Sequence, residues 1–98
     1  MEVFYLKLAI IIIMRIDKFL NAVNITKRRA VAEDMLAHQV VFINNQSVKK
    51  SKEVKVGDII EIKYLDKSDK FKVLQVPTTK STPKSKMLEY VEKLSDEG

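Results

Sequence analysis

The sequence contains no cysteine, a single histidine, two glycines and two prolines among its 98 residues. The lack of cysteine excludes a disulfide framework, a zinc ribbon, an iron–sulfur centre and a thiol nucleophile. The single histidine, His38, excludes metal sites that need two or more imidazoles. Two glycines are too few for a glycine-rich loop that cradles a nucleotide phosphate. The sequence also lacks paired acids at a useful spacing and a nucleophile–base pattern, so we expect no cofactor, no metal and no small-molecule substrate.

The chain is long enough for one small domain with a tail. Hydrophobic residues make up 46% of it, which supports a folded core and argues against disorder. A chain of this length buries only somewhat more than ~60% of its unfolded surface, so we expect a small core and modest stability. Such a core does not favour a deep enzyme cleft, and we expect a protein that is not an enzyme. The absence of cysteine fits a cytoplasmic protein, which is the expected localisation.

The longest apolar run covers residues 8–14 and reads LAIIIIM. A membrane-spanning helix needs about 20 apolar residues, so we expect no membrane association from this run. A secretory signal is disfavoured because no small-residue cleavage site follows it. Two interpretations of residues 1–13 stay open: an additional strand at a sheet edge, or an extension upstream of a natural start at Met14.

The hydrophobic period of residues 14–37 predicts two short helices that pack as a pair. The first has an apolar stripe at i, i+3, i+4 and i+7, made of Ile16, Phe19, Leu20 and Val23. Asn24 and Ile25 end it, and Thr26 is a good N-cap for a second helix over Lys27–Ala37. Ile25 and Ala30 stand at the positions of a hydrophobic staple. The predicted buried face of the second helix consists of Val31, Ala32, Met35 and Leu36.

Residues 40–98 read as short strands followed by a tail. The expected strands are Val40–Ile43, Gln46–Val48, Ile59–Tyr64 and Lys70–Val76. Asn44-Asn45 predicts a tight turn because asparagine tolerates positive φ, whereas Lys49–Lys55 reads as a polar connection. Pro77–Lys86 has three lysines and no acid, which is typical of a flexible basic linker. Thr82-Pro83 then predicts the start of an amphipathic tail helix, whose apolar stripe is Met87, Leu88, Val91 and Leu94.

Basic residues gather in the first half of the chain. The whole chain carries a net charge of +5, and residues 15–55 hold nine basic and four acidic residues, a difference that is also +5. Lys27, Arg28 and Arg29 occupy the predicted first turn of the second helix, where the helix dipole disfavours each exposed cation by ~0.3–1 kcal/mol. Because local rules are most often broken at functional sites, this triplet predicts phosphate binding rather than only a solvated basic face.

The predicted second helix does not suit base reading in a DNA major groove. After its first turn it reads AVAEDMLAH, in which Glu33 and Asp34 are acidic and most of the rest is small or apolar. Such a helix offers few side chains for base edges, so folded RNA recognised through its backbone and shape is favoured. A small DNA-binding regulator, and an accessory RNA-binding module for an rRNA- or tRNA-modifying enzyme, stay open as alternatives.

Four motifs, in order and at matching spacing, resemble the S4 RNA-binding domain over roughly residues 14–64. They are MRIDKFL from Met14, the KRR triplet, and the segments VVFINN and VKVGD within residues 40–58. The resemblance implies an α+β fold in which two short helices pack on a small, strongly bent antiparallel sheet, with RNA lying across the basic helix pair. We expect this domain, with an additional strand, in residues 14–76, and a basic linker and tail helix in residues 77–98.

Within this family, the chain is most similar to small stand-alone, ribosome-associated members, a group that includes a short heat-shock protein. The sequence TTK at residues 78–80, before the tail helix, adds to this likeness. The resemblance implies binding to ribosomal RNA of the large subunit and to peptidyl-tRNA, in ribosome-associated quality control of stalled nascent chains. We expect the protein to act as a monomer.

The resemblance also implies the residues that bind RNA. Arg15 matches the arginine of the first motif and Arg29 the arginine that closes the basic triplet, and both would contact phosphates. The expected RNA-binding set is Arg15, Lys18, Lys27, Arg28, Arg29, Lys49, Lys50 and Lys52. Asp17 is expected to orient Arg15 or to cap the first helix. Family members often carry a basic residue where this chain has Asn24, so one phosphate contact is expected to be missing.

Overall fold

A computed structural model describes residues 13–94 of the chain. Both interpretations of the N-terminal extension concern residues that, apart from Ile13, lie outside this range. The described elements, in chain order, are β1 (Met14–Arg15), α2 (Ile16–Ala22), α3 (Arg29–Ala37), β2 (Val41–Ile43), β3 (Gln46–Ser47), β4 (Glu53–Val54), β5 (Ile59–Lys63), β6 (Ser68–Val73), a 3-10 turn (Lys84–Lys86), α4 (Met87–Tyr90) and β7 (Val91–Leu94).

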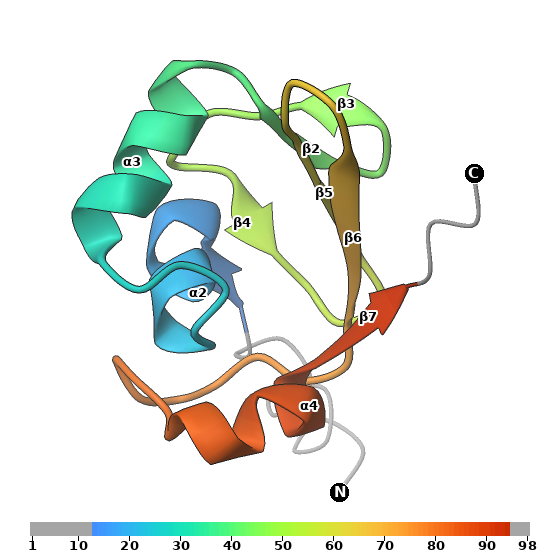
Figure 1. The fold of residues 1–98 in the computed structure, drawn as a ribbon. Helices are drawn as coiled ribbons and strands as arrows, with labels where there is room; N and C mark the ends of the chain where they lie inside the picture. Colours follow the sequence, from blue (N-terminus) through green and yellow to red (C-terminus); the bar gives the residue numbers. More distant parts are fainter. Residues whose placement is uncertain (1–12, 95–98) are drawn as a thin grey trace, which may run out of the picture.

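The strands form two antiparallel sheets. A five-stranded sheet has the order β3-β2-β5-β6-β7, and a two-stranded sheet joins β1 to β4. Figure 1 shows α2 and α3 together on one side of the molecule, β4 beside them, and the larger sheet on the other side. The α+β class predicted from the sequence, with a packed helix pair and antiparallel strands, is confirmed.

The core lies between the helix pair and the larger sheet. All four residues of the predicted stripe on α2 are fully buried, and they share one apolar cluster with Val41, Ile43, Ile60 and Ile62. The helical period of the sequence therefore predicted the buried face of α2 correctly. The buried face of α3 is narrower than predicted, because Val31 is exposed. Ala32 and Leu36 are buried, and Met35 is half-buried.

The second helix begins two residues later than predicted, and Thr26 is not its N-cap. Arg28 occupies the N-cap with an extended backbone (φ −133°), and no side chain caps the helix. Thr26 is instead buried, and its backbone N–H donates to the Leu20 carbonyl at 3.0 Å, which folds this segment back onto α2. The predicted staple is also wrong, because Ala30 lies on the exposed side of the helix.

Strands β4 and β7 lie in segments that were not predicted to be strands. Within the predicted polar connection, Glu53 and Val54 form β4, and Val54 is fully buried. A tail helix is present, but it ends at Tyr90, and the chain continues as β7, which pairs with β6 in the register Val73↔Val91. The ladder with β6 and the complete burial of Val91 stabilise this strand in place of further helical turns.

The predicted turn at Asn44-Asn45 is confirmed, whereas the strand predicted to end at Tyr64 ends one residue earlier. Asn44 and Asn45 both adopt positive φ, at 52° and 70°, in the tight turn between β2 and β3. Tyr64 lies just beyond the end of β5 and is 45% exposed. Its partial burial, and secondarily the Asp69 carboxylate, raise the pKa of the Tyr64 hydroxyl.

Candidate nucleic-acid interface

A buried carboxylate holds two arginines at the start of the helix pair. Asp17 lies in the first turn of α2 and is fully buried. Its Oδ1 accepts a hydrogen bond from Arg15 Nε at 3.2 Å, and its Oδ2 accepts one from Arg15 Nη2 at 2.8 Å. Arg29 Nη2, from the first turn of α3, lies 3.7 Å from the same Oδ2. Asp17 therefore orients Arg15, as expected, and also draws Arg29 to the same point.

The two guanidinium groups keep free hydrogen-bonding capacity. The side chain of Arg15 is 42% exposed and that of Arg29 is 51% exposed. Arg29 makes a further ion pair with Glu33, Nε to Oε2 at 3.5 Å, one helical turn along. Each guanidinium has five N–H donors in a planar fork, and Arg15 gives two of them to Asp17. The remaining donors suit the planar, bidentate recognition of phosphate.

The lysine-rich segment 49–52 is joined to the start of α2 by backbone hydrogen bonds. The N–H of Ile16 donates to the Lys52 carbonyl at 2.7 Å, and the N–H of Asp17 donates to the Lys50 carbonyl at 3.4 Å. These carbonyls satisfy N–H groups that the first turn of a helix leaves unpaired. Because β1 also pairs with β4, the exposed Lys49, Lys50 and Lys52 come beside Arg15.

The basic triplet is arranged differently from the prediction. Only Arg29 lies inside the first turn of α3, while Arg28 is the N-cap and Lys27 precedes it. The expected conflict with the helix dipole therefore applies to Arg29 alone, and the carboxylates of Asp17 and Glu33 offset it. Lys27 and Arg28 are exposed in the segment between the two helices, next to this cluster in the chain.

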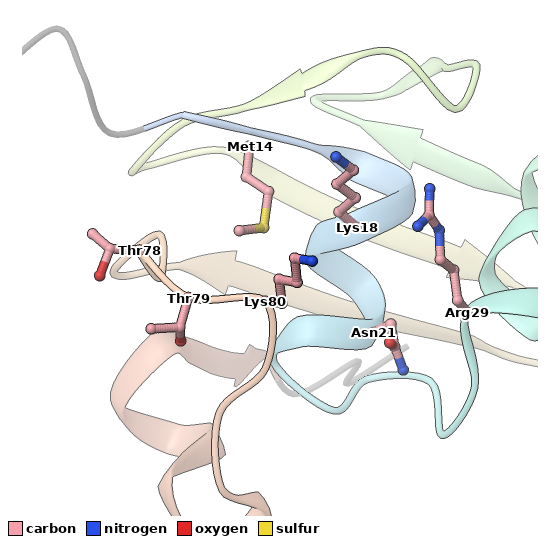
Figure 2. Close-up of a pocket in the computed structure, with 7 residues that line it drawn as sticks. All are labelled: Met14, Lys18, Asn21, Arg29, Thr78, Thr79 and Lys80. Atoms are coloured by element: carbon pink, nitrogen blue, oxygen red, sulfur yellow. The ribbon is translucent and has the colours of Figure 1, made fainter.

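The same surface contains a groove that the sequence did not predict. Its volume is about 430 Å³, and Figure 2 shows the lining side chains, which come from β1, α2, α3 and the segment 78–80: Met14, Lys18, Asn21, Arg29, Thr78, Thr79 and Lys80. Met14 and Lys18 also line a neighbouring hollow with Arg15. A further hollow is lined in part by Lys49, Lys50 and Glu33, and Glu33 is the residue that pairs with Arg29. Five of the predicted cations, Arg15, Lys18, Arg29, Lys49 and Lys50, therefore line one or more of these depressions.

The predicted flexible linker is docked onto α2. Thr82 is buried, and both its backbone N–H and its hydroxyl donate to the Ala22 carbonyl, at 3.0 and 2.8 Å. Asn24, with a positive φ of 70°, donates its side-chain amide to the Thr82 carbonyl at 2.9 Å. Thr82 therefore does not cap a helix. Asn24 stands where relatives are expected to carry a basic residue, and its hydrogen bond to Thr82 helps to hold the tail against α2.

No metal site or membrane-spanning helix emerges from the described part of the chain. Within residues 13–94, no group of three or more His, Asp or Glu side chains could hold a metal ion. No helix in the same range is long and apolar enough to cross a bilayer. His38 lies at the C-cap of α3, and its ring Nδ1 is 2.8 Å from the Asp34 carbonyl.

Known proteins include a family and individual relatives whose sequences are similar to this chain. The sequence model of the S4 domain family matches residues 14–60. The RQC P-site tRNA stabilizing factor of Helicobacter pylori strain J99 is 46% identical over 71 residues, which cover 72% of this chain and 84% of that relative. This chain belongs to the S4-domain family of RQC P-site tRNA stabilizing factors.

Solved structures support the family assignment. The solution structure of the hypothetical protein HP1423 is 40% identical, covers 86% of this chain and all of that one (100%), and superposes with a TM-score of 0.73. The trimeric structure of Vibrio cholerae Heat Shock Protein 15 has a TM-score of 0.74 over 85% of this chain and 83% of that one. At 22% identity, this second likeness concerns the fold alone.

Family membership confirms the class of function predicted from the sequence. The S4 domain is an RNA-binding domain, and its match includes Arg15, Asp17, Arg29 and the lysine-rich segment. The comparisons do not favour a DNA-binding regulator or an accessory module of an RNA-modifying enzyme. The segment 78–80 lies beyond the family match, so its place in the groove comes from the structure.

Proposed function

We propose that this chain is a cytoplasmic, non-enzymatic protein that binds ribosomal RNA of the large subunit and peptidyl-tRNA in ribosome-associated quality control of stalled nascent chains. The relatives are named as stabilizing factors for P-site tRNA, which supports this proposal. The observation that carries it is the pair of arginines fixed by Asp17 beside an exposed lysine segment. Such a surface recognises phosphates in a fixed geometry.

In the proposed mechanism, contacts to phosphates position the protein on the RNA. Arg15 and Arg29 would bond phosphate oxygens directly, because their free N–H donors are held at a fixed place. Lys18, Lys27, Arg28, Lys49, Lys50 and Lys52 would add field strength and contacts along the strand. Phosphate contacts fix register and orientation without reading sequence. A protein that binds tRNA and ribosomal RNA at the same time stabilises the complex of the two and slows the dissociation of the tRNA from the ribosomal subunit.

The proposed acting unit is a monomer. Asp17, both arginines and the lysine segment come from one chain, so the surface needs no residue from a second copy. The proposed domain spans residues 14–76, and the tail adds contacts from residues 77–98.

Sedimentation with purified large ribosomal subunits tests the function. The tagged protein should pellet more with subunits that retain peptidyl-tRNA than with empty subunits. Arg15→Ala and Arg29→Ala should each weaken pelleting and flatten the dependence of log affinity on log salt by about one unit, the loss of one phosphate contact. Lys72→Ala is a matched control, because it removes one charge from an exposed position on β6.

The outcomes separate the parts of the proposal. Equal pelleting with both kinds of subunit would contradict the peptidyl-tRNA part and indicate a general ribosomal RNA binder. A salt slope that neither arginine variant changes would contradict the assigned surface. Failure of the wild-type protein to pellet at low salt would contradict ribosome binding altogether.

A further inference from the structure

The groove between α2 and the segment 78–80 differs in composition from the Asp17 cluster, which consists of Asp17, Arg15 and Arg29. Lys18 and Asn21 come from the exposed side of α2, and Thr78, Thr79 and Lys80 come from the tail (Figure 2). Arg29 borders the groove as well as the Asp17 cluster. The groove therefore combines three cations with hydroxyl and amide groups, whereas the Asp17 cluster and the segment 49–52 offer mainly cations.

The groove is fixed by anchors on both sides of the segment 78–80. Before it, Val76 and Pro77 are buried. After it, Thr82 makes two hydrogen bonds to the Ala22 carbonyl and accepts one from Asn24. Because the anchors hold the ends of this short segment, Lys80 is kept near α2 in the absence of a ligand. A preformed site loses less conformational entropy on binding.

The polar groups of the groove match a ribose as well as a phosphate. Lys18, Arg29 and Lys80 supply positive charge for a phosphate. The Thr79 hydroxyl donates to the Ser81 carbonyl at 2.8 Å, so its oxygen keeps lone pairs that can accept. The Asn21 amide nitrogen donates to the Thr26 carbonyl at 3.4 Å, which leaves the amide oxygen as an acceptor. A ribose 2′-hydroxyl can donate to either oxygen, and DNA has no such group.

We propose that this groove binds one ribose–phosphate step of an RNA strand, with the phosphate at Lys80 and Lys18 and the 2′-hydroxyl at Thr79. It would make the protein prefer RNA to DNA of the same sequence. The inference rests on the proposed RNA-binding function and deepens it. A strand is favoured over a free nucleotide because Lys18 and Met14 connect the groove to the hollow at Arg15, where the next phosphates would lie.

Fluorescence anisotropy with a labelled RNA hairpin and its all-deoxy counterpart, over a series of salt concentrations, tests the phosphate contact. Lys80→Ala should weaken RNA binding about three- to tenfold and lower the salt slope by about one unit. Lys84→Ala is the matched control, since it removes the same charge from an exposed lysine of the tail outside the groove. Equal behaviour of these two variants would overturn the groove assignment.

The 2′-hydroxyl contact is tested by the ratio of RNA affinity to DNA affinity. Thr79→Val should lower this ratio about threefold or more, and Thr79→Ser, which keeps the hydroxyl, should restore it. A ratio that Thr79→Val leaves unchanged would overturn the ribose contact. Adenosine monophosphate in excess should not displace the hairpin, and displacement by it would overturn the assignment to a strand.

Arg15→Ala in the same assay separates this inference from the proposed function. If Arg15→Ala weakens RNA binding while Lys80→Ala matches Lys84→Ala, only the groove assignment fails. If the wild-type protein does not bind the hairpin at low salt, both proposals fail.

Discussion

Asp17→Asn separates positioning of the arginines from simple charge. The substitution keeps the shape of the side chain but removes the carboxylate that bonds Arg15 at 3.2 and 2.8 Å and lies 3.7 Å from Arg29. It raises the net charge from +5 to +6, because one acid is lost. If charge alone set RNA affinity, the variant would bind more tightly. If Asp17 positions the arginines, it binds more weakly in spite of the added charge.

The stability loss can be worked from the burial of the three groups. Removing one partner of a fully buried ion pair costs about 3–5 kcal/mol. Asp17 is fully buried, but Arg15 and Arg29 are 42% and 51% exposed, so water can hydrate both after the change. The asparagine oxygen also still accepts a hydrogen bond. These two effects reduce the expected loss to about 1–3 kcal/mol, and each kcal/mol lowers Tm by about 4–8 °C in a domain of this size.

Urea denaturation and hairpin anisotropy at one fixed salt concentration measure the two effects. We expect a lower unfolding midpoint and RNA binding about three- to tenfold weaker. Asp34→Asn is the matched control, since it gives the same charge change at an exposed carboxylate, whose Oδ1 lies 3.5 Å from His38 Nδ1. Asp17→Asn binding RNA more tightly than wild type, by the same factor as Asp34→Asn, would refute the positioning argument.

The remaining predictions concern the segments that hold the interface. Thr26→Val should raise the free energy of unfolding by up to about 1 kcal/mol, because the buried Thr26 hydroxyl has no hydrogen-bond partner in the described structure; a loss of stability in urea would contradict this. Thr82→Val should lower the free energy of unfolding by about 1–2 kcal/mol, because the hydrogen bond from the Thr82 hydroxyl to the Ala22 carbonyl is lost; thermal unfolding beside Thr78→Val, an exposed control, checks this value. Asn24→Ala should be about 1 kcal/mol less stable than Asn24→Gly in urea, since only glycine adopts the positive φ without cost.

The parts of the fold that local patterns specify were predictable. The stripe on α2 follows the helical period, and all of it is buried. The asparagine turn at Asn44-Asn45 follows from the tolerance of asparagine for positive φ. The class of the fold and the family follow from such patterns together with the ordered motifs.

Elements that depend on distant partners were not predictable from local composition. Thr26 has the side chain of a helix cap, but its N–H is committed to Leu20, so the helix begins later. Glu53 and Val54 are too short a run to register as a strand, and they form one only by pairing with β1. The residues of β7 have the hydrophobic pattern of an amphipathic helix, but in the folded protein they form a strand because they pair with β6.

The arrangement of the proposed RNA-binding residues was not predictable from the sequence. The sequence located the cations, yet nothing in it required Arg15 and Arg29 to meet at one carboxylate. The groove depends on a still longer connection, from Thr82 to the Ala22 carbonyl. The last carbonyls of a helix lack partners within the helix, and α2 obtains one from the tail. The hydrogen bond from Thr82 to the end of α2 therefore brings Lys80 to the proposed RNA-binding face. A hydrogen bond between a side chain and a distant backbone carbonyl leaves no periodic pattern in a sequence.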